Sequence, residues 1–239
     1  MRTHRSFRAA ASREDSFHPC RCPSPTTVLG GYSFAMTRLP YLQRSDLDDA
    51  GQALWDAIVD SRGQTVVNDA GGLVGPFNAW VHAPGVGARV SALGATLRFE
   101  TSLERRLLEL AIIVVAAHWK AEFEWWAHAS MARQHGVDDA IVAGIGRGET
   151  PSFEARDEAV VYAFARQLVV SGGIDDATFA QAVEALGREG VVELASLCGY
   201  YTLVSYTLNA FAVPLPPGVA PAWPKSGDET QVRSLLSDG

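Results

Sequence analysis

From Ser45 onward the chain repeats apolar residues every three or four positions, which is the spacing of amphipathic helices. A first helix is expected over 46–60, where Leu47, Leu54 and Ile58 share one face and Ser45 can cap the N-terminus. No stretch of convincing length alternates apolar and polar residues as a strand does. The pattern therefore predicts an all-α protein.

A second helix is expected over 84–98, because Pro84 suits a first helical position. Its apolar stripe consists of Val86, Val90, Leu93 and Leu97. Gly87 and Gly94 lower the helix propensity of this segment, but they would let a neighbouring helix pack closely.

The longest helical pattern opens at Ser102 and contains no proline or glycine before Gly136. Thr101 and Glu104 have the spacing of a capping box, and Gly136 suits a C-terminal stop. A single helix here would exceed thirty residues, which is long for a globular domain. We therefore expect a break within it.

Two helices are expected between residues 138 and 173. Asp138 caps a short one, and the longer one ends at Gly172. The apolar stripe of the longer helix is formed by Val160, Val161, Phe164 and Leu168.

Two more helices are expected before the proline-rich end of the chain. Asp175 or Asp176 caps the first. Its inward-facing residues are expected to be Phe179, Val183 and Leu186. The last runs over about 191–211, within a stretch of twenty residues without a charge. Because it carries several Ser, Thr and Asn side chains and no flanking Lys or Arg, we expect a buried central helix and not a membrane span.

Composition and charge are those of an ordinary globular protein with an acidic body. The 239 residues are 47% hydrophobic and 20% charged, with a formal net charge of -7. Residues 1–35 carry five arginines against two acidic residues, so the negative charge lies in the remainder. We expect no nucleic acid partner, because binding phosphates requires an excess of Lys and Arg.

Three regions are expected. Residues 1–38 lack an apolar period and are rich in Arg, Ser, Pro and Gly, which indicates a disordered leader. This leader is expected to be either an organellar transit peptide or the product of an over-extended gene start, with the natural start at Met36. Residues 39–215 form the helical domain, and 216–239 form a Pro-rich, polar tail.

The cysteines indicate a reducing setting. Cys20 and Cys22 lie in the leader, and Cys198 is alone in the body, so the body has no pair from which to build a disulfide. This favours a cytoplasmic protein.

The segment HWKAEFEWWAH, residues 118–128, places ionisable and aromatic residues directly after an apolar run. Glu124 and His128 are four residues apart, so on a helix they share a face and can hydrogen-bond. Glu109 lies fifteen residues before Glu124, and the path between them is nearly all apolar. Burial raises the pKa of a carboxyl group, and a buried Glu beside a His is suited to proton transfer.

A surface role is the alternative. Glu124 and His128 could be a solvated pair, and Glu109 could pair with Arg105 or Arg106 on an exposed face. The same turn also carries Phe123, Trp125 and Trp126. Such crowding of aromatic residues favours a core or a ligand pocket.

The order Glu109, Ala121, Glu124 and His128, with separations of twelve, three and four residues, resembles the carboxymuconolactone decarboxylase and alkylhydroperoxidase D (AhpD-like) superfamily. The stretches around it are similar to the decarboxylase-like branch over about residues 40–215. The resemblance implies an AhpD-like bundle of about seven to nine helices, two of which meet near residues 118–121.

The peroxidase branch of that superfamily uses a CxxC pair, and this chain has Ala121 and Glu124 at those positions. The resemblance therefore implies a cofactor-free lyase that decarboxylates a small cyclic carboxylic acid or lactone. In this interpretation His128 donates the proton, Glu124 orients and tunes it, and Glu109 is a second relay or base.

Other residues within the stretches that resemble this superfamily are candidates for binding the substrate. His118 would bind a substrate carboxylate or oxyanion, or else form a hydrogen bond at the helix junction. The remaining candidates to line the pocket are Trp125, Asn78, Trp80 and His82.

Two other functions stay open, an AhpD-like alkylhydroperoxidase and a non-catalytic ligand-binding relative. We expect no metal, because the chain has no HExxH, no paired ExxH and no cysteine cluster. The expected partners are a small-molecule substrate and, as the resemblance implies, copies of the chain itself in a trimer, a hexamer or a dimer.

Overall fold

The fold is given by a computed structural model that describes residues 37–223. The predictions for the leader up to residue 36, with Cys20 and Cys22, and for the tail beyond residue 223 lie outside the described residues. Within 37–223 the chain is helical and has no strand, so the all-α prediction is confirmed. An isolated bridge between Val67 and Leu73 interrupts the helices only locally.

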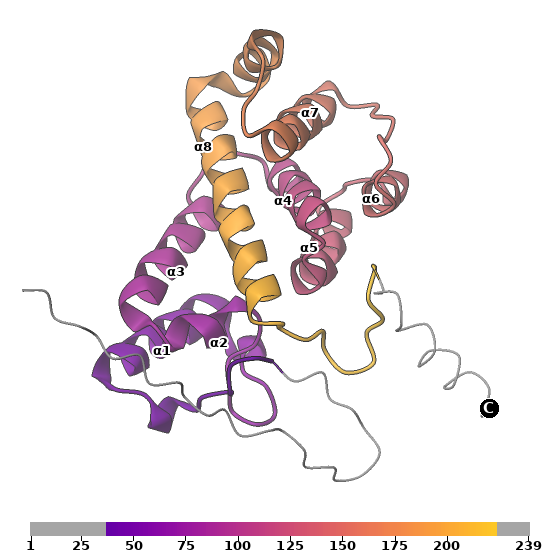
Figure 1. The fold of residues 1–239 in the computed structure, drawn as a ribbon. Helices are drawn as coiled ribbons and strands as arrows, with labels where there is room; N and C mark the ends of the chain where they lie inside the picture. The colour runs from indigo at the N-terminus through magenta and orange to yellow at the C-terminus, as the bar shows by residue number, and fades with distance from the viewer. Residues whose placement is uncertain (1–36, 224–239) are drawn as a thin grey trace, which may run out of the picture. The chain divides into compact units, whose positions relative to one another are not determined.

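Figure 1 shows the order of the elements in the described range. The α-helices are α1 (Asp49–Arg62), α2 (Pro76–Val81), α3 (Pro84–Phe99), α4 (Arg105–Trp119), α5 (Glu122–Gln134), α6 (Asp139–Gly146), α7 (Arg156–Ser171) and α8 (Asp176–Ala210). Short 3-10 helices span Arg44–Asp46 and Gln64–Val66. Gly187 has a non-helical backbone with a positive φ of 70 and a ψ of 173, so α8 consists of two helices joined at this residue.

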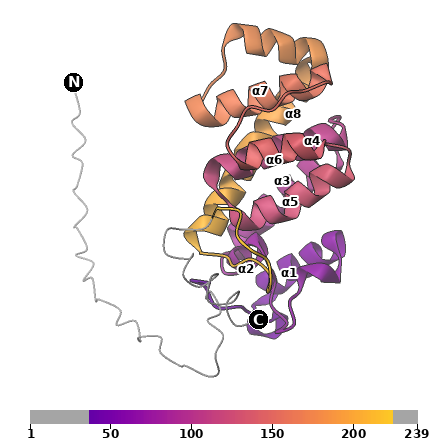
Figure 2. The ribbon, with the colours of Figure 1, turned by 90° about the vertical axis from the view of Figure 1, so that its right-hand side faces the viewer.

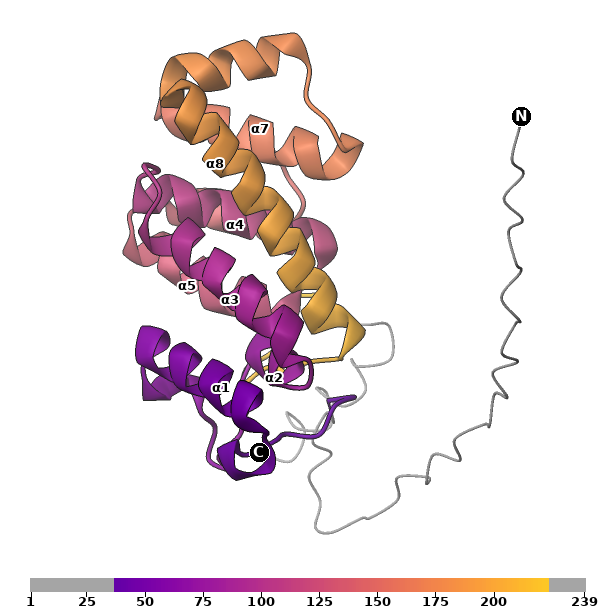
Figure 3. The ribbon, with the colours of Figure 1, turned by 90° about the vertical axis from the view of Figure 1, so that its left-hand side faces the viewer.

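Helix α4 is the centre of the bundle. It packs against α5, α7 and α8, and every residue from Leu107 to Ala116 is buried. A helix that is buried on all sides must be apolar on all sides, and this one is, except for Glu109. Figures 2 and 3 show α7 and the first part of α8 on one side of the α3 to α6 layer, and α1 and α2 on the other.

The break expected in the long helical segment is present at Lys120. This residue adopts the left-handed conformation, with φ 48 and ψ 43, between the end of α4 and the start of α5. The backbone N–H of Lys120 donates to the carbonyl of Ala117 at 3.2 Å, and that of Ala121 donates to the carbonyl of Ala116 at 3.0 Å. These two bonds form a Schellman motif, which ends a helix with its last carbonyls satisfied. The position of the helix end is hard to predict from the sequence, because a lysine stands where such motifs usually have glycine.

Polar side chains of α8 hold this junction in place. Asn209 Nδ2 donates to the carbonyl of Trp119 at 2.9 Å, and Trp119 Nε1 donates to Thr202 Oγ1 at 3.2 Å. The polar residues within the uncharged stretch of the last helix are thus used for packing against the α4–α5 junction. No helix within residues 37–223 is long and apolar enough to cross a bilayer.

Two of the expected helix caps are wrong. Helix α1 is capped by Asp48, whose Oδ1 accepts from the N–H of Gly51 at 2.8 Å, and Ser45 lies in the preceding 3-10 helix.

Helix α4 begins at Arg105 with Glu104 as its N-cap and no capping side chain. Thr101 Oγ1 donates to the carbonyl of Leu97, so it terminates α3 and does not start α4. The expected caps of α6 and α8, Asp138 and Asp175, are confirmed.

The expected apolar face of α3 is correct for Leu97 and wrong for Val86 and Leu93. Val86 and Leu93 are 63% and 50% exposed. The buried residues of α3 are Gly87, Ser91, Gly94 and Leu97. Small residues face inward because α2 and α8 come close on that side, which is the close packing expected at Gly87 and Gly94. In α8 Phe179 is 48% exposed, so the expectation that it faces inward fails in the same way.

We predict that Gly94→Ala destabilises the fold. A Cβ atom at Gly94 would overlap the hydroxyl oxygen of Tyr200, so α3 or Tyr200 must move. Such overpacking costs about 1–3 kcal/mol of the free energy of unfolding, measured by urea denaturation. Gly85→Ala is the matched control on the same helix, because nothing lies within 4 Å of a Cβ there. Equal stability of the two variants would contradict the close α3–α8 contact.

Candidate active site

The Schellman turn at Lys120 brings a glutamate of α4 to a histidine of α5. Glu109 and His128 are nineteen residues apart, and along one continuous helix this separation would exceed about 28 Å. In the structure His128 Nδ1 and Glu109 Oε2 are 2.5 Å apart. The site therefore depends on the break between the two helices.

A second carboxylate occupies the other side of the same imidazole ring. Glu124, one turn before His128 on α5, places its Oε1 2.9 Å from His128 Nε2. Glu109, Glu124 and His128 are 0%, 5% and 4% exposed, so the whole cluster is buried. We call these three residues the His128 cluster. The alternative of a solvated surface pair is wrong.

The outer oxygen of Glu109 is neutralised by Arg105. Arg105 Nη2 lies 2.8 Å from Glu109 Oε1, a contact with the distance of an ion pair but without the direction of a hydrogen bond. Arg105 is itself fixed, because its Nη1 donates to the backbone carbonyl of Arg98 at the end of α3. Arg106, the other partner considered from the sequence, binds Asp157 and Glu158 of α7 instead.

The two carboxylates keep the buried imidazole charged. Burial alone would lower the pKa of His128, but the charges of Glu124 and Glu109 and their hydrogen bonds raise it to about 8. Burial likewise favours the neutral form of Glu109, yet His128, Arg105 and Arg98 together lower its pKa. At neutral pH the ring is therefore an imidazolium that donates from Nδ1 to Glu109 and forms an ion pair with Glu124 through Nε2.

Tyrosines of α8 close the cluster. The rings of His128 and Tyr201 meet edge to face with centroids 5.1 Å apart, and Tyr200 packs on Tyr201 at 5.2 Å. Burial raises the pKa of both phenols above the ordinary value, so they stay neutral donors beside the carboxylates. Neither tyrosine was expected from the sequence. The adjacent Tyr residues in an otherwise uncharged helix are the only signal, and it does not distinguish them from core residues.

The other candidate residues lie apart from the His128 cluster. Asn78 Nδ2 donates to the carbonyl of Pro40 at 3.1 Å, and His82 Nε2 lies 3.0 Å from the same carbonyl, so both hold the segment before α1. Trp80 is buried against Phe77. Their proposed role in substrate binding stays a prediction, since no contact of theirs with the cluster supports it.

His118 and Trp125 also face elsewhere. His118 is largely exposed in the last turn of α4, where its ring packs against Trp119. The remaining partial burial of the ring and the charge of Arg166 lower its pKa. Trp125 packs on Trp223 at 5.2 Å, and it lines a pocket of about 300 Å³ between α5 and residues 215–222. Neither residue is brought to the His128 ring.

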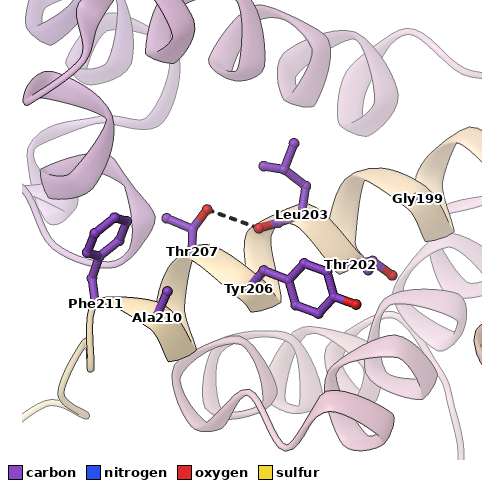
Figure 4. Close-up of a pocket in the computed structure, with 7 residues that line it drawn as sticks. All are labelled: Gly199, Thr202, Leu203, Tyr206, Thr207, Ala210 and Phe211. Atoms are coloured by element: carbon purple, nitrogen blue, oxygen red, sulfur yellow. Dashed lines mark hydrogen bonds between the residues drawn. The ribbon is translucent and has the colours of Figure 1, made fainter. Parts of the chain in front are cut away.

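A shallow groove of about 520 Å³ lies on another face of α8 (Figure 4). It is lined by Gly199, Thr202, Leu203, Tyr206, Thr207, Ala210 and Phe211. No residue of the His128 cluster lines it, so its size does not make it the site of the chemistry.

Among residues 37–223 there is no group of three or more His, Cys, Asp or Glu side chains arranged to hold a metal ion. Glu109 and Glu124 bind opposite nitrogens of the ring, so their oxygens do not converge on one point.

The geometry defines a helical protein with a buried imidazolium held between two carboxylates. Its fold is that of AhpD-like proteins, as two solved structures show. An uncharacterized peroxidase-related protein with an AhpD core from Ralstonia eutropha JMP134 has a TM-score of 0.62 and 15% identity, covering 81% of this chain and 100% of that one. A protein of unknown function from Agrobacterium tumefaciens, for which an AhpD antioxidant defence role has been suggested, has a TM-score of 0.52 and 17% identity, covering 58% and 96%. No family model and no curated protein matches the sequence.

We predict a pH dependence of stability that His128 causes. Its pKa is raised from 6.5 to about 8, so its contribution is complete below about pH 6.5 and is lost as the pH rises through 8. This is about 2 kcal/mol of the free energy of unfolding, measured by urea denaturation between pH 6 and 9. Glu109 produces the opposite pH dependence. Its pKa is lowered, so its contribution to the free energy of unfolding is lost as the pH falls below the ordinary range of a carboxyl group.

His128→Gln removes the titrating group and should flatten the alkaline limb. An NMR titration of the wild-type imidazole gives the pKa directly. A value at or below 6.5, or equal slopes for the two proteins, would show that the carboxylates do not hold the ring charged.

Proposed function

We propose that this protein is a cofactor-free lyase that decarboxylates a small cyclic carboxylic acid or lactone, with His128 as the proton donor. The observation that carries the proposal is the buried His128 imidazolium, held by two carboxylates and charged at neutral pH. A general acid is most effective when its pKa lies near the working pH, and a pKa of about 8 meets that condition.

The reaction needs one proton and no external electron acceptor. When the carbon–carbon bond to the carboxylate breaks, carbon dioxide leaves and the electron pair delocalises into a conjugated carbonyl of the substrate. The resulting enolate is then protonated on carbon, and the proton lost by the imidazolium is recovered from water. The protein has to exclude water, stabilise the enolate and deliver the proton.

The three residues of the cluster are suited to different parts of this task. Glu109 is fully buried and fixed by Arg105, so it holds the ring and favours its protonated form. Glu124 is the carboxylate on Nε2, and it must move aside or accept the proton before Nε2 can reach a substrate. We propose that Glu124 is the relay on the substrate side and Glu109 is the fixed partner.

Peroxide reduction is the second candidate, because the structures with the same fold are described as peroxidase-related or AhpD-like. Thiol peroxidases attack with a thiolate. Cys198, the cysteine within residues 37–223, is buried, and burial raises the pKa of its thiol to about 12. A thiol of this kind is neutral and inaccessible, which argues against its use as a nucleophile.

We expect His128→Gln to lower decarboxylation by at least about 100-fold, the usual contribution of a general acid. Carbon dioxide release is measured over a panel of carboxylated γ-lactones and cyclic β-keto acids. His135→Gln is the matched control, because His135 is exposed at the end of the same helix. If an accepted substrate is turned over equally by wild type and His128→Gln, the role of His128 is wrong. If no member of the panel is turned over, the third candidate, a non-catalytic ligand-binding relative, is favoured.

For peroxide reduction we expect no cysteine-dependent turnover of tert-butyl hydroperoxide by the full chain. Cys198→Ser and a Cys20→Ser, Cys22→Ser double variant are assayed beside wild type with a dithiol reductant. Turnover that disappears in either variant would contradict the acid–base assignment and restore the peroxidase.

A further inference from the structure

Arg105 occupies an electrostatically unfavourable place in α4. It is the first residue of the helix, and the first turn contains Arg105 and Arg106 but no acidic residue. The N-terminal end of a helix carries a partial positive charge, so acidic residues are preferred there and cations are not. Arg106 is compensated by ion pairs with Asp157 and Glu158 of α7, at 2.6 and 2.7 Å. Arg105 makes contacts of a different kind, and they lead to the His128 cluster.

The guanidinium of Arg105 bridges the end of α3 and the buried carboxylate of Glu109. Its Nη2 lies 2.8 Å from Glu109 Oε1, and its Nη1 donates to the backbone carbonyl of Arg98 at 2.8 Å. The guanidinium also lies 5.9 Å from the centre of the Phe99 ring. The side chain of Arg105 is 26% exposed, whereas that of Glu109 has no exposure. Arg105 therefore reaches Glu109 from the outside of the bundle, and the end of α3 holds it in place.

The two carboxylates of the cluster are consequently not equivalent. Glu109 Oε2 is bonded to His128 Nδ1 and its Oε1 faces Arg105, so both of its oxygens have a cationic neighbour. Glu124 has His128 Nε2 at 2.9 Å and, within residues 37–223, no ion pair with an arginine or a lysine. Its side chain keeps 6% exposure. Glu109 is thus compensated twice and fixed, and Glu124 is compensated once and is the more accessible of the two.

We propose that Arg105 is a positioning residue of the site, which neutralises Glu109 from the outside and thereby keeps it as the fixed partner of His128 Nδ1. A carboxylate that is held by both a guanidinium and an imidazolium gains little from a further proton. The proton released by the ring therefore leaves on the Nε2 side, through Glu124 to the enolate, and water restores it to the ring. The effect of Arg105 on turnover rests on the proposed function, but its effect on the charge of the ring does not.

The ionisable groups that act on the cluster come from α3, α4, α5 and α8. They are Arg98, Arg105, Glu109, Glu124, Tyr200 and Tyr201. The two phenols stay neutral, because burial raises the pKa of both. Burial also favours the neutral form of Glu109, but the hydrogen bond and charge of His128 and the charges of Arg105 and Arg98 lower its pKa. Without Arg105, two buried carboxylates would face one imidazolium, so the cluster should bind its protons more tightly.

The test is an NMR titration of the His128 imidazole in the full chain between pH 6 and 10. The wild-type midpoint should lie at about 8, and Arg105→Gln should raise it by about one unit, because a nearby positive charge is lost. Arg105→Lys keeps the charge and should restore the wild-type midpoint. A substitution that merely loosened the fold would expose the ring to water and move the midpoint towards 6.5, the opposite direction.

Arg106→Gln is the matched control. Arg106 is the next residue of the same turn, but its ion pairs join α4 to α7, so the His128 midpoint should not change. Circular dichroism checks that each variant is folded. If Arg105→Gln does not fold, the carbon-13 titration of the Glu109 carboxyl in the wild type decides, and a midpoint at or above 4.5 would overturn the proposal.

Turnover gives a separate measurement. Where a substrate is accepted, the alkaline limb of the pH–rate profile should move upward in Arg105→Gln by the same amount as the imidazole midpoint, and Arg105→Lys should reverse the shift. If His128→Gln retains full turnover, the proposed function is wrong, and the imidazole titration of the wild type and the arginine variants still tests Arg105. A midpoint that is unchanged or lowered in Arg105→Gln, or raised equally in Arg106→Gln, would show that Arg105 does not hold the cluster in this way.

Discussion

The carboxylate of Glu109 is the constraint on which this structure depends. It lies in the middle of the most deeply buried helix and has no exposure to solvent. An unpaired charge in such a place costs several kcal/mol, so the fold must supply partners. It supplies His128 from α5 on one side and Arg105 from the preceding turn on the other. The packing of α5 on α4 is therefore determined by an electrostatic requirement as well as by apolar contact.

This requirement explains why the α4–α5 junction is built so firmly. A Schellman turn at Lys120 reverses the chain, and Asn209 and Thr202 of α8 bind Trp119 beside it. The left-handed conformation of Lys120 costs about 1 kcal/mol for a residue with a Cβ atom. The pairing that it allows is worth more, because without the turn Glu109 and His128 would lose their shortest contact, and each would keep only the partner on its own helix. The polar residues of α8 thus contribute to the site without touching it.

The His128 cluster shows how the fold accommodates several charges out of water. In the cluster, positive and negative groups alternate from Arg105 through Glu109 and His128 to Glu124, and each charge is compensated. The ring of Tyr201 packs on His128, and the ring of Tyr200 packs on Tyr201. Charge that is balanced in this way within the chain stabilises the fold and keeps the imidazole protonated.

The sequence alone determined the helical class, most helix positions and the i, i+4 pair of Glu124 and His128, because these depend on spacing along one helix. It also indicated a break in the long segment, since its length was excessive. The sequence-based prediction failed for part of the buried face of α3, where glycines are buried in place of the expected valine and leucine. Local periodicity does not reveal how closely a neighbouring helix approaches. Only the tertiary structure decided that Glu109 meets His128, that Tyr200 and Tyr201 cover them, and that Asn78, Trp80, His82, His118 and Trp125 lie elsewhere. The physical reason is that contacts between helices depend on where the chain turns and how closely the helices approach.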